Sequence, residues 1–252
     1  SCHLGRLDYG SLPQQALMEL LIDGITNKEK LCRSKDEPVN VEEWVGVTVN
    51  ANKEVIQLEW MFKNLQGIIH FEWLPSTTKS VVLNTSQLSG NTDWNVLPES
   101  ITRFSIRDNE FEGSMHLQSL PKKITIFNAA FNRFSGSLDL EGLPDSFDQL
   151  FLHANNFTGP VSLTKLPPKI AILNLSENSL SGCLDLTSLP NSRLRLILDT
   201  NKFAGETDFS KLPDTLGFLS IKNLDITGEI RCRNNDGKFL VENSGVQVIE
   251  KL

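Results

Sequence analysis

Apolar side chains recur along this chain with one internal spacing and a period of 23 residues. Ile170, Leu173 and Leu175 precede Asn178, and the same pattern precedes the asparagine one period earlier. A glycine keeps the same step at Gly67, Gly90, Gly113, Gly136, Gly159, Gly182, Gly205 and Gly228. Seven Leu-Pro pairs keep it too, at Leu74-Pro75, Leu97-Pro98, Leu120-Pro121, Leu143-Pro144, Leu166-Pro167, Leu189-Pro190 and Leu212-Pro213. The glycines therefore indicate eight stacked coils.

Each coil is predicted to contain two short strands. Successive side chains of a strand point to opposite faces, so the apolar alternation before the asparagine predicts a strand with one buried face. A second alternation follows each glycine, as at Leu138 and Leu140, and predicts another strand. A single coil would expose both of its flat ends, so stacking is needed for stability.

The periodic asparagines are expected to pair the backbone groups that the turn inside each coil leaves unpaired, because an amide offers both donors and an acceptor. This predicted ladder consists of Asn109, Asn132, Asn155, Asn178 and Asn201. Lys63, Ser86 and Leu224 replace the asparagine in the first, second and eighth coils.

The ends of such a stack must be covered. A capping box at Ser11 and Gln14, with Pro13, predicts an amphipathic helix that runs to about Ile25. Turn residues at 235–237 and 243–245 bracket apolar stretches and predict a closing hairpin. We therefore expect an N-terminal capping region at 1–54, eight repeats at 55–230 and a C-terminal cap at 231–252.

The pattern LxxLxLxxNxLxG over residues 55–230 resembles the leucine-rich repeat family. The Ser-Gly pairs at 89–90 and 181–182 resemble plant-type repeats, and the segment at 44–47 is similar to their N-terminal cap. The cap lacks the paired cysteines that bracket this segment in plant receptors. The resemblance implies an α/β solenoid, a right-handed superhelix with a parallel β-sheet on its concave face, a helical N-terminal cap and a β-hairpin-like C-terminal cap. It also implies recognition of a protein partner by the concave face.

Strand positions that alternate with the buried pair are expected to face outward on the concave side. Phe131, Phe151 and His153 would form an aromatic centre flanked by arginines, and aromatic and Arg side chains are typical hot spots of interfaces. Scattered exposed apolar residues are also ordinary on protein surfaces. The candidate partner-binding residues are Arg103, Arg107, Asn128, Phe131, Phe151, His153, Asn174, Arg195, Asp199, Phe218 and Lys222.

Composition and motifs narrow the function. A formal charge of −7 argues against a nucleic-acid surface, and no apolar run approaches the roughly 20 residues that span a bilayer. No HExxH, GxSxG, P-loop or GxGxxG segment is present, and a spaced aspartate column at 93, 139, 185 and 208 does not converge as a Ca²⁺ site requires. We expect no catalytic residues, no metal and no cofactor.

The spacing of the cysteines indicates the cellular compartment of the protein. Cys2, Cys32, Cys183 and Cys232 show no CxxC spacing, which favours an intracellular, cytoplasmic setting over secretion, although Cys2 and Cys32 could pair in an oxidising one. Cys232 is expected to be a buried small apolar residue. Sequons at Asn84, Asn156 and Asn174 are interpreted as accidental.

The predicted function is a non-enzymatic interaction module or scaffold that binds a protein partner. The alternative is an extracellular receptor ectodomain or an enzyme-inhibitor-like protein that recognises a secreted ligand; the oligomeric state stays open.

Overall fold

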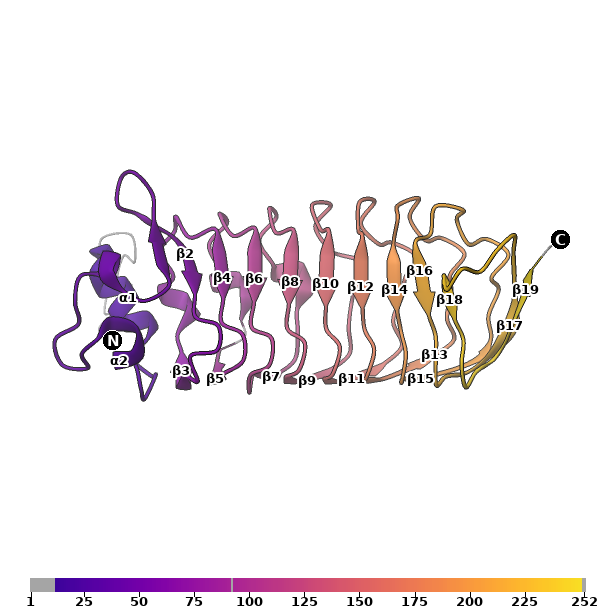
Figure 1. Ribbon diagram of the computed structural model, residues 1–252, viewed down its shortest axis with the longest axis horizontal. Helices are drawn as coiled ribbons and strands as arrows, with labels where there is room; N and C mark the ends of the chain where they lie inside the picture. Colours follow the sequence, from indigo (N-terminus) through magenta and orange to yellow (C-terminus); the bar gives the residue numbers. More distant parts are fainter. Residues whose placement is uncertain (1–11, 92, 251–252) are drawn as a thin grey trace, which may run out of the picture.

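The computed structural model describes residues 12–91 and 93–250, and in this part of the chain two long parallel sheets run side by side along a solenoid (Figure 1). The larger sheet has ten strands: β1 (Val47–Val49), β2 (Val55–Glu59), β4 (Ser80–Val82), β6 (Arg103–Ser105), β8 (Ile126–Asn128), β10 (Gln149–Phe151), β12 (Ile172–Asn174), β14 (Arg195–Ile197), β16 (Phe218–Ser220) and β18 (Phe239–Leu240). Its strands pair in parallel, except that β1 is antiparallel to β2.

The second sheet is formed mainly by the residues that lead up to the glycine of each coil. The predicted strand after the glycine is therefore wrong for most coils: Leu138 and Leu140 are buried, but they lie in an irregular segment that follows Gly136. The seven strands of the second sheet are β7 (Glu112–Gly113), β9 (Arg133–Gly136), β11 (Asn156–Gly159), β13 (Ser179–Gly182), β15 (Lys202–Glu206), β17 (Asp225–Cys232) and β19 (Gly245–Glu250). In the first two coils the same position is held by a separate pair, β3 (Gln66–Ile69) and β5 (Gln87–Gly90). In each of the first three coils a 3-10 turn follows this strand: η3 (Phe71–Trp73), η4 (Trp94–Val96) and η5 (Leu117–Ser119).

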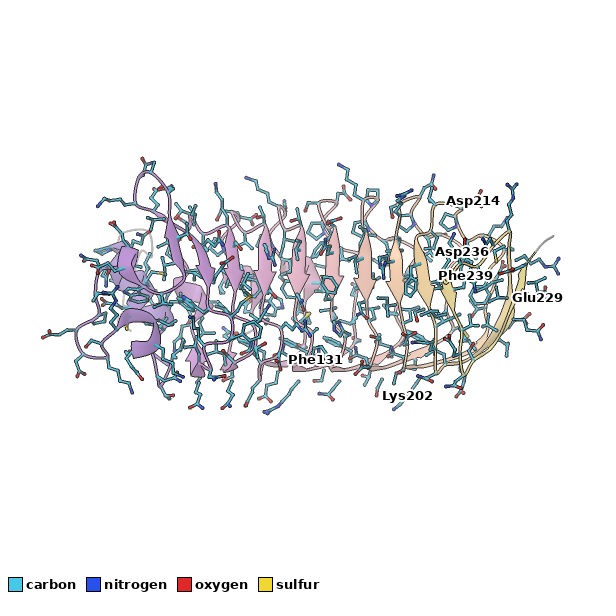
Figure 2. All side chains as sticks on the ribbon, viewed as in Figure 1. Phe131, Lys202, Asp214, Glu229, Asp236 and Phe239 are labelled. Atoms are coloured by element: carbon cyan, nitrogen blue, oxygen red, sulfur yellow. The ribbon has the colours of Figure 1, made fainter. Side chains whose placement is uncertain are left out.

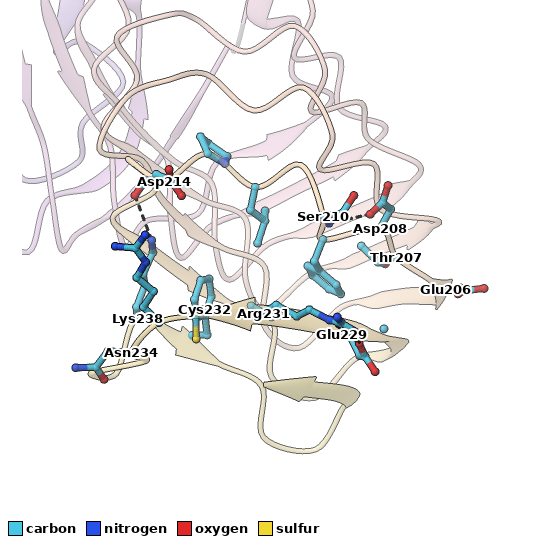
Figure 3. Close-up of a pocket in the computed structure, with 17 residues that line it drawn as sticks. Glu206, Thr207, Asp208, Ser210, Asp214, Glu229, Arg231, Cys232, Asn234 and Lys238 are labelled. Atoms are coloured by element: carbon cyan, nitrogen blue, oxygen red, sulfur yellow. Dashed lines mark hydrogen bonds and ion pairs between the residues drawn. The ribbon is translucent and has the colours of Figure 1, made fainter. Parts of the chain in front are cut away.

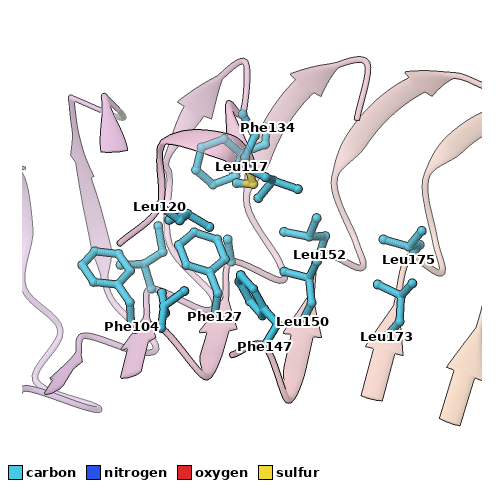
Figure 4. Close-up of a cluster of buried hydrophobic side chains, with 14 of the residues drawn as sticks. Phe104, Leu117, Leu120, Phe127, Phe134, Phe147, Leu150, Leu152, Leu173 and Leu175 are labelled. Atoms are coloured by element: carbon cyan, nitrogen blue, oxygen red, sulfur yellow. The ribbon is translucent and has the colours of Figure 1, made fainter. Parts of the chain in front are cut away.

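The strand register repeats every 23 residues, as the sequence period predicts. Leu150 lies opposite Leu173, which lies opposite Leu196. Leu173 and Leu175 are fully buried. Figure 4 shows this packing as rows of side chains along the solenoid, with Phe104 and Phe127 continuing the row of Leu150 and Leu173. At about 1.5–3 kcal/mol for each buried side chain, these rows are the main source of stability.

The N-terminal cap is helical, as predicted, but its helices are short. α1 (Gln14–Leu21) has Pro13 at its N-cap position without a side-chain cap, and it ends before the predicted limit at Ile25. The predicted capping residue Ser11 lies outside the described residues. α2 (Glu29–Cys32) and η2 (Val41–Glu43) complete the cap, and Met18, Leu21 and Leu31 are buried against the first coil.

The predicted closing hairpin is wrong. β18 pairs in parallel with β16 in the large sheet, whereas β19 pairs in parallel with β17 in the second sheet. The turn at 243–245 therefore carries the chain from one sheet to the other, as the turn does in every complete coil. The result is a shortened ninth coil. It extends each of the two sheets by one strand.

Candidate partner-binding surface

The outer side of the ten-stranded sheet, here called the sheet face, presents the residues predicted for the concave side. On β8, β10 and β12 the central residue is buried and points into the core, whereas its two neighbours are half-buried and point outward. Neighbouring strands lie about 4.8 Å apart, so outward residues at equal positions form columns along the solenoid.

Under this face the ladder asparagines hold the chain where it turns away from each strand. Asn132 Nδ2 donates to the carbonyl oxygens of Ile106, Ala129 and Ala130 at 2.9–3.2 Å, and Asn132 Oδ1 accepts from the Phe111 N–H. Asn109, Asn155, Asn178 and Asn201 make the equivalent four bonds in their own coils. The sheet face therefore lies above a row of buried or half-buried amides whose hydrogen bonds are satisfied, and these bonds fix its strands in register.

Four of the candidate residues form one contact cluster across the third to fifth coils. The Arg107 guanidinium lies 5.0 Å from the centre of the Phe131 ring. The Phe131 ring meets the His153 ring edge to face at 5.1 Å, and Phe151 approaches His153 from its own strand at 6.3 Å. We call Arg107, Phe131, Phe151 and His153 the aromatic cluster. Arg107 and Phe131 are exposed, whereas Phe151 and His153 are half-buried.

The electrostatics of the cluster keep His153 neutral. Partial burial, together with the positive charge of Arg107, lowers the pKa of His153 from 6.5 to about 4. Its Nδ1 is buried and has no hydrogen-bond partner among the described residues. At neutral pH the cluster is thus an apolar and aromatic patch that carries one positive charge, that of Arg107.

A second, smaller group of two residues lies in the seventh and eighth coils. Arg195 and Phe218 are register partners on β14 and β16, and the Arg195 guanidinium lies 4.9 Å from the centre of the Phe218 ring. This cation–π contact repeats the chemistry of Arg107 and Phe131. Arg103 lies on β6 and is exposed, without an ion pair to any described residue.

The structure does not bring the remaining candidates into either group. Oδ1 of Asn128 accepts from the Ala130 N–H, and Oδ1 of Asn174 accepts from both the N–H and the hydroxyl of Ser176. Asp199 Oδ1 accepts from the Lys222 N–H at 2.8 Å. These acceptors are engaged by the sheet's own backbone, which reduces what they offer to a partner.

Solved structures show which fold this is. The chain superimposes on the PEPR1–AtPEP1 structure with a TM-score of 0.64 and 20% identity, over 94% of this chain and 35% of that chain. The fold is that of leucine-rich repeat proteins. A TDR receptor structure gives a TM-score of 0.61 at 22% identity, over 76% of this chain and 35% of that one. The structure of the Arabidopsis receptor kinase HAESA, in complex with the peptide hormone IDA and the co-receptor SERK1, gives a TM-score of 0.55 at 16% identity, over 92% of this chain and 50% of that chain.

This chain thus spans about a third to a half of those leucine-rich repeat chains. The sequence matches no family model and no curated protein. At these identities the likeness concerns the fold.

Sequence reasoning missed two features of the leucine-rich repeat surface. The residue before the ladder position adopts a left-handed backbone in every coil, with φ of 53–60° at Phe62, Thr85, Asp108, Phe131, Ala154, Glu177, Thr200 and Asn223. Phe131 thus lies just past the end of its strand, at the edge of the sheet face (Figure 2). Phe62 occupies the same position in the first coil and is 71% exposed, the most of any large apolar side chain in the described residues.

Other chemistry is sparse in the described residues. They contain no group of three or more His, Cys, Asp or Glu side chains placed to hold a metal. Cys32, Cys183 and Cys232 are free thiols there; Cys183 is exposed and Cys232 is half-buried rather than fully buried as predicted. The alternative pairing of Cys2 with Cys32 falls partly outside the described residues. None of the described helices combines the length and apolarity needed to cross a bilayer.

Proposed function

We propose that this chain is a non-enzymatic protein-binding module whose partner docks on the sheet face over the aromatic cluster. The single observation that carries the proposal is the contact chain from Arg107 through Phe131 and His153 to Phe151. Arg and aromatic side chains that are already held in place lose little conformational entropy on binding, and they dominate the energy of many interfaces.

The position of the cluster supports the same function. It lies in the third to fifth coils, near the middle of the large sheet. Strands extend beyond it in both directions along the solenoid, so a partner can also contact the coils on either side of the cluster. Phe131 is 39% exposed although it is a large aromatic residue. Neutral His153 adds no charge that a partner would have to desolvate, so only Arg107 needs an acceptor or an aromatic partner.

The structural comparisons support a protein or peptide as the partner. The HAESA structure contains a peptide hormone and a co-receptor, and the PEPR1 structure is named together with AtPEP1. The same likeness favours the second candidate, an extracellular receptor ectodomain or an inhibitor-like protein that recognises a secreted ligand. The Asn156 sequon is compatible with it, because Asn156 is exposed on β11 in the second sheet, away from the aromatic cluster.

Two alanine substitutions test the proposed binding surface. Arg107→Ala and Phe151→Ala each remove a central contact, and each is expected to weaken partner capture by at least tenfold, about 1.4 kcal/mol or more. Affinity capture from the native source identifies the partner, and titration with that partner measures the loss. Gln57→Ala, on the same face in the first coil, is the matched control and is expected to bind normally.

Unfolding curves of the variants check that the solenoid is intact. If folded Arg107→Ala and Phe151→Ala both keep the affinity of the unaltered chain, the partner does not use this surface. Glycan analysis of Asn156 in the native protein separates the two candidate functions, because a glycan there requires passage through the secretory pathway.

A further inference from the structure

A slot lies between the seventh and eighth coils (Figure 3), and no residue of the aromatic cluster lines it. Its volume is about 1460 Å³. One wall is the return arc of the seventh coil, the segment at 205–213 that leads from its glycine to its Leu-Pro pair. The other wall is β17, and Phe209, Ile230, Cys232 and Phe239 line the interior.

The slot exists because the eighth coil does not form a return arc. In most of the earlier coils the glycine is followed by apolar residues two and four positions on and by Leu-Pro, as at Leu184, Leu186 and Leu189, and each arc stacks on the one before it. The corresponding residues of the eighth coil are Ile230, Cys232 and Asn235. Instead of bending, β17 continues straight for eight residues, paired with β19 as far as Cys232.

The two walls diverge from one end to the other. At the narrow end the Thr207 N–H donates to the Thr227 carbonyl at 2.9 Å, and Gly228 leaves room for the Phe209 ring, which a Cβ would meet at 2.9 Å. At the wide end Lys238 Nζ reaches the Asp214 carbonyl at 3.4 Å. The slot therefore has the place and the outline of one missing arc.

The size and charge of the slot indicate which class of ligand fits it. Pockets for small molecules measure about 300–1,000 Å³, so this slot is large for one and suits a peptide segment. Glu206 and Asp208 stand at the narrow end, where Glu229 is paired with Arg231 at 2.7 Å. Basic side chains stand toward the wide end, with Lys238 beside Asp214 (Figure 3). A segment that runs in the direction of the neighbouring arcs would place its amino end on the acidic side and its carboxyl end on the basic side.

We propose that the slot binds a peptide segment of a partner protein that lies parallel to the return arc at 205–213 and supplies apolar side chains at positions i, i+2 and i+5. Such a segment takes the place of the arc that the eighth coil lacks. Its side chains pack on Phe209, Ile230 and Phe239, as each arc packs on its neighbour. The site is separate from the sheet face, so it does not depend on the function proposed above.

The chain itself supplies a probe. A synthetic peptide of residues 136–144 is the cysteine-free arc of the fourth coil, with Leu138, Leu140 and Leu143 at the required spacing. It is added to the full chain while iodoacetamide alkylates the thiols, and mass spectrometry follows each cysteine. At about ten times its Kd the peptide should slow alkylation of Cys232 about tenfold. Cys183 is exposed and does not line the slot, so it serves as the internal control.

A matched peptide with Leu138→Asn and Leu140→Asn keeps the length and charge and should not protect Cys232. Equal protection by both peptides, protection by neither, or equal protection of Cys183 would overturn the proposal. Acetylation and amidation of the peptide ends should weaken binding, and an unchanged affinity would overturn the assigned direction.

A variant that fills the slot gives an independent test. Cys232→Trp should lower the affinity for the 136–144 peptide at least tenfold in calorimetric titration, whereas Cys183→Trp should leave it unchanged. Normal binding by folded Cys232→Trp would contradict the proposed site. If that variant does not fold, the alkylation experiment on the unaltered chain decides the question.

Discussion

The coils that carry a ladder asparagine and the coils at the two ends share one period but are held together differently. In the third to seventh coils each asparagine side chain makes four hydrogen bonds to the backbone, as at Asn132. In the second coil Ser86 Oγ only accepts from the Leu65 N–H, at 3.3 Å. In the eighth coil the position is Leu224, whose side chain is apolar and buried.

This difference shows where the repeat is constrained. Apolar stacking alone tolerates changes of path, because it is not directional, whereas a buried amide needs its partners at fixed positions. The eighth coil, which lacks the amide, is the one whose chain leaves the common path along β17 and opens the slot. The aromatic cluster lies over ladder coils, which gives the proposed binding surface a rigid support.

The largest expected effect comes from removing one ladder amide. Asn132→Ala would remove four hydrogen bonds and leave the buried Phe111 N–H without a partner, and it should lower the free energy of unfolding by about 3 kcal/mol or more. The three carbonyl oxygens each keep one donor, from Asn109, Asn155 or the Asp108 N–H. Ser86→Ala removes one weak acceptor and should cost about 1 kcal/mol or less. Urea denaturation of both variants measures the difference. Equal losses would show that the amides do not distinguish the two regions.

Two glycines at the same repeat position provide the next comparison. A Cβ at Gly136 would meet only the Ser114 Cβ, at 3.8 Å, so Gly136→Ala should cost about 1–2 kcal/mol through its φ of 86°. A Cβ at Gly228 would lie 2.6 Å from the Thr207 carbonyl oxygen and 2.9 Å from the Phe209 ring. Gly228→Ala should therefore cost about 3 kcal/mol. Thermal unfolding of both variants tests this order, and a larger loss for Gly136→Ala would contradict it.

Much of this fold follows from local sequence. The period fixes which side chains are buried, and the pairs such as Leu173 and Leu175 are fully enclosed because every coil repeats them in register. The outward positions follow from the strand alternation, so Phe151 and His153 could be placed on the surface. The aromatic centre that joins them to Phe131 is also expected from the sequence, but the left-handed turn at Phe131 that sets the contact geometry is not, because it depends on the path of the chain after the strand.

The residue types at these positions give little indication of the left-handed turn after each strand. Among the eight left-handed repeat positions, only Asp108 and Asn223 are residue types that favour this conformation; Phe62, Phe131 and the threonines are not. The neighbouring backbone ladder imposes the turn, as in the bond from the Phe131 N–H to the His153 carbonyl. The hairpin was mispredicted for a similar reason: local turn residues indicate a reversal, but the preceding coils decide which strand each segment pairs with.

A smaller effect on the free energy of unfolding is expected from the protonation of His153, which lies in a ladder coil. The pKa of His153 is lowered to about 4, so the unfolded chain binds a proton at a higher pH than the folded chain does. Stability should be unaffected above about pH 6.5 and should fall as the pH drops toward about 4. His153→Gln should remove this part of the pH dependence, measured by urea denaturation at about pH 7.5 and about pH 5. An unchanged slope in the variant would mean that His153 titrates normally.

The smallest expected effect lies in an end coil and has the opposite sign. Thr78 is fully buried at the position of Val55 and Ile101, and its hydroxyl has no hydrogen-bond partner among the described residues. Thr78→Val keeps the shape and removes an unsatisfied polar group, so it should stabilise the chain by about 1 kcal/mol. Its neighbour is the control: Thr77 Oγ1 donates to the Val55 carbonyl at 2.8 Å, so Thr77→Val should destabilise by about as much. A loss of stability in both variants would mean that the Thr78 hydroxyl is also satisfied, and that the end coils are bound by polar contacts as closely as the ladder coils.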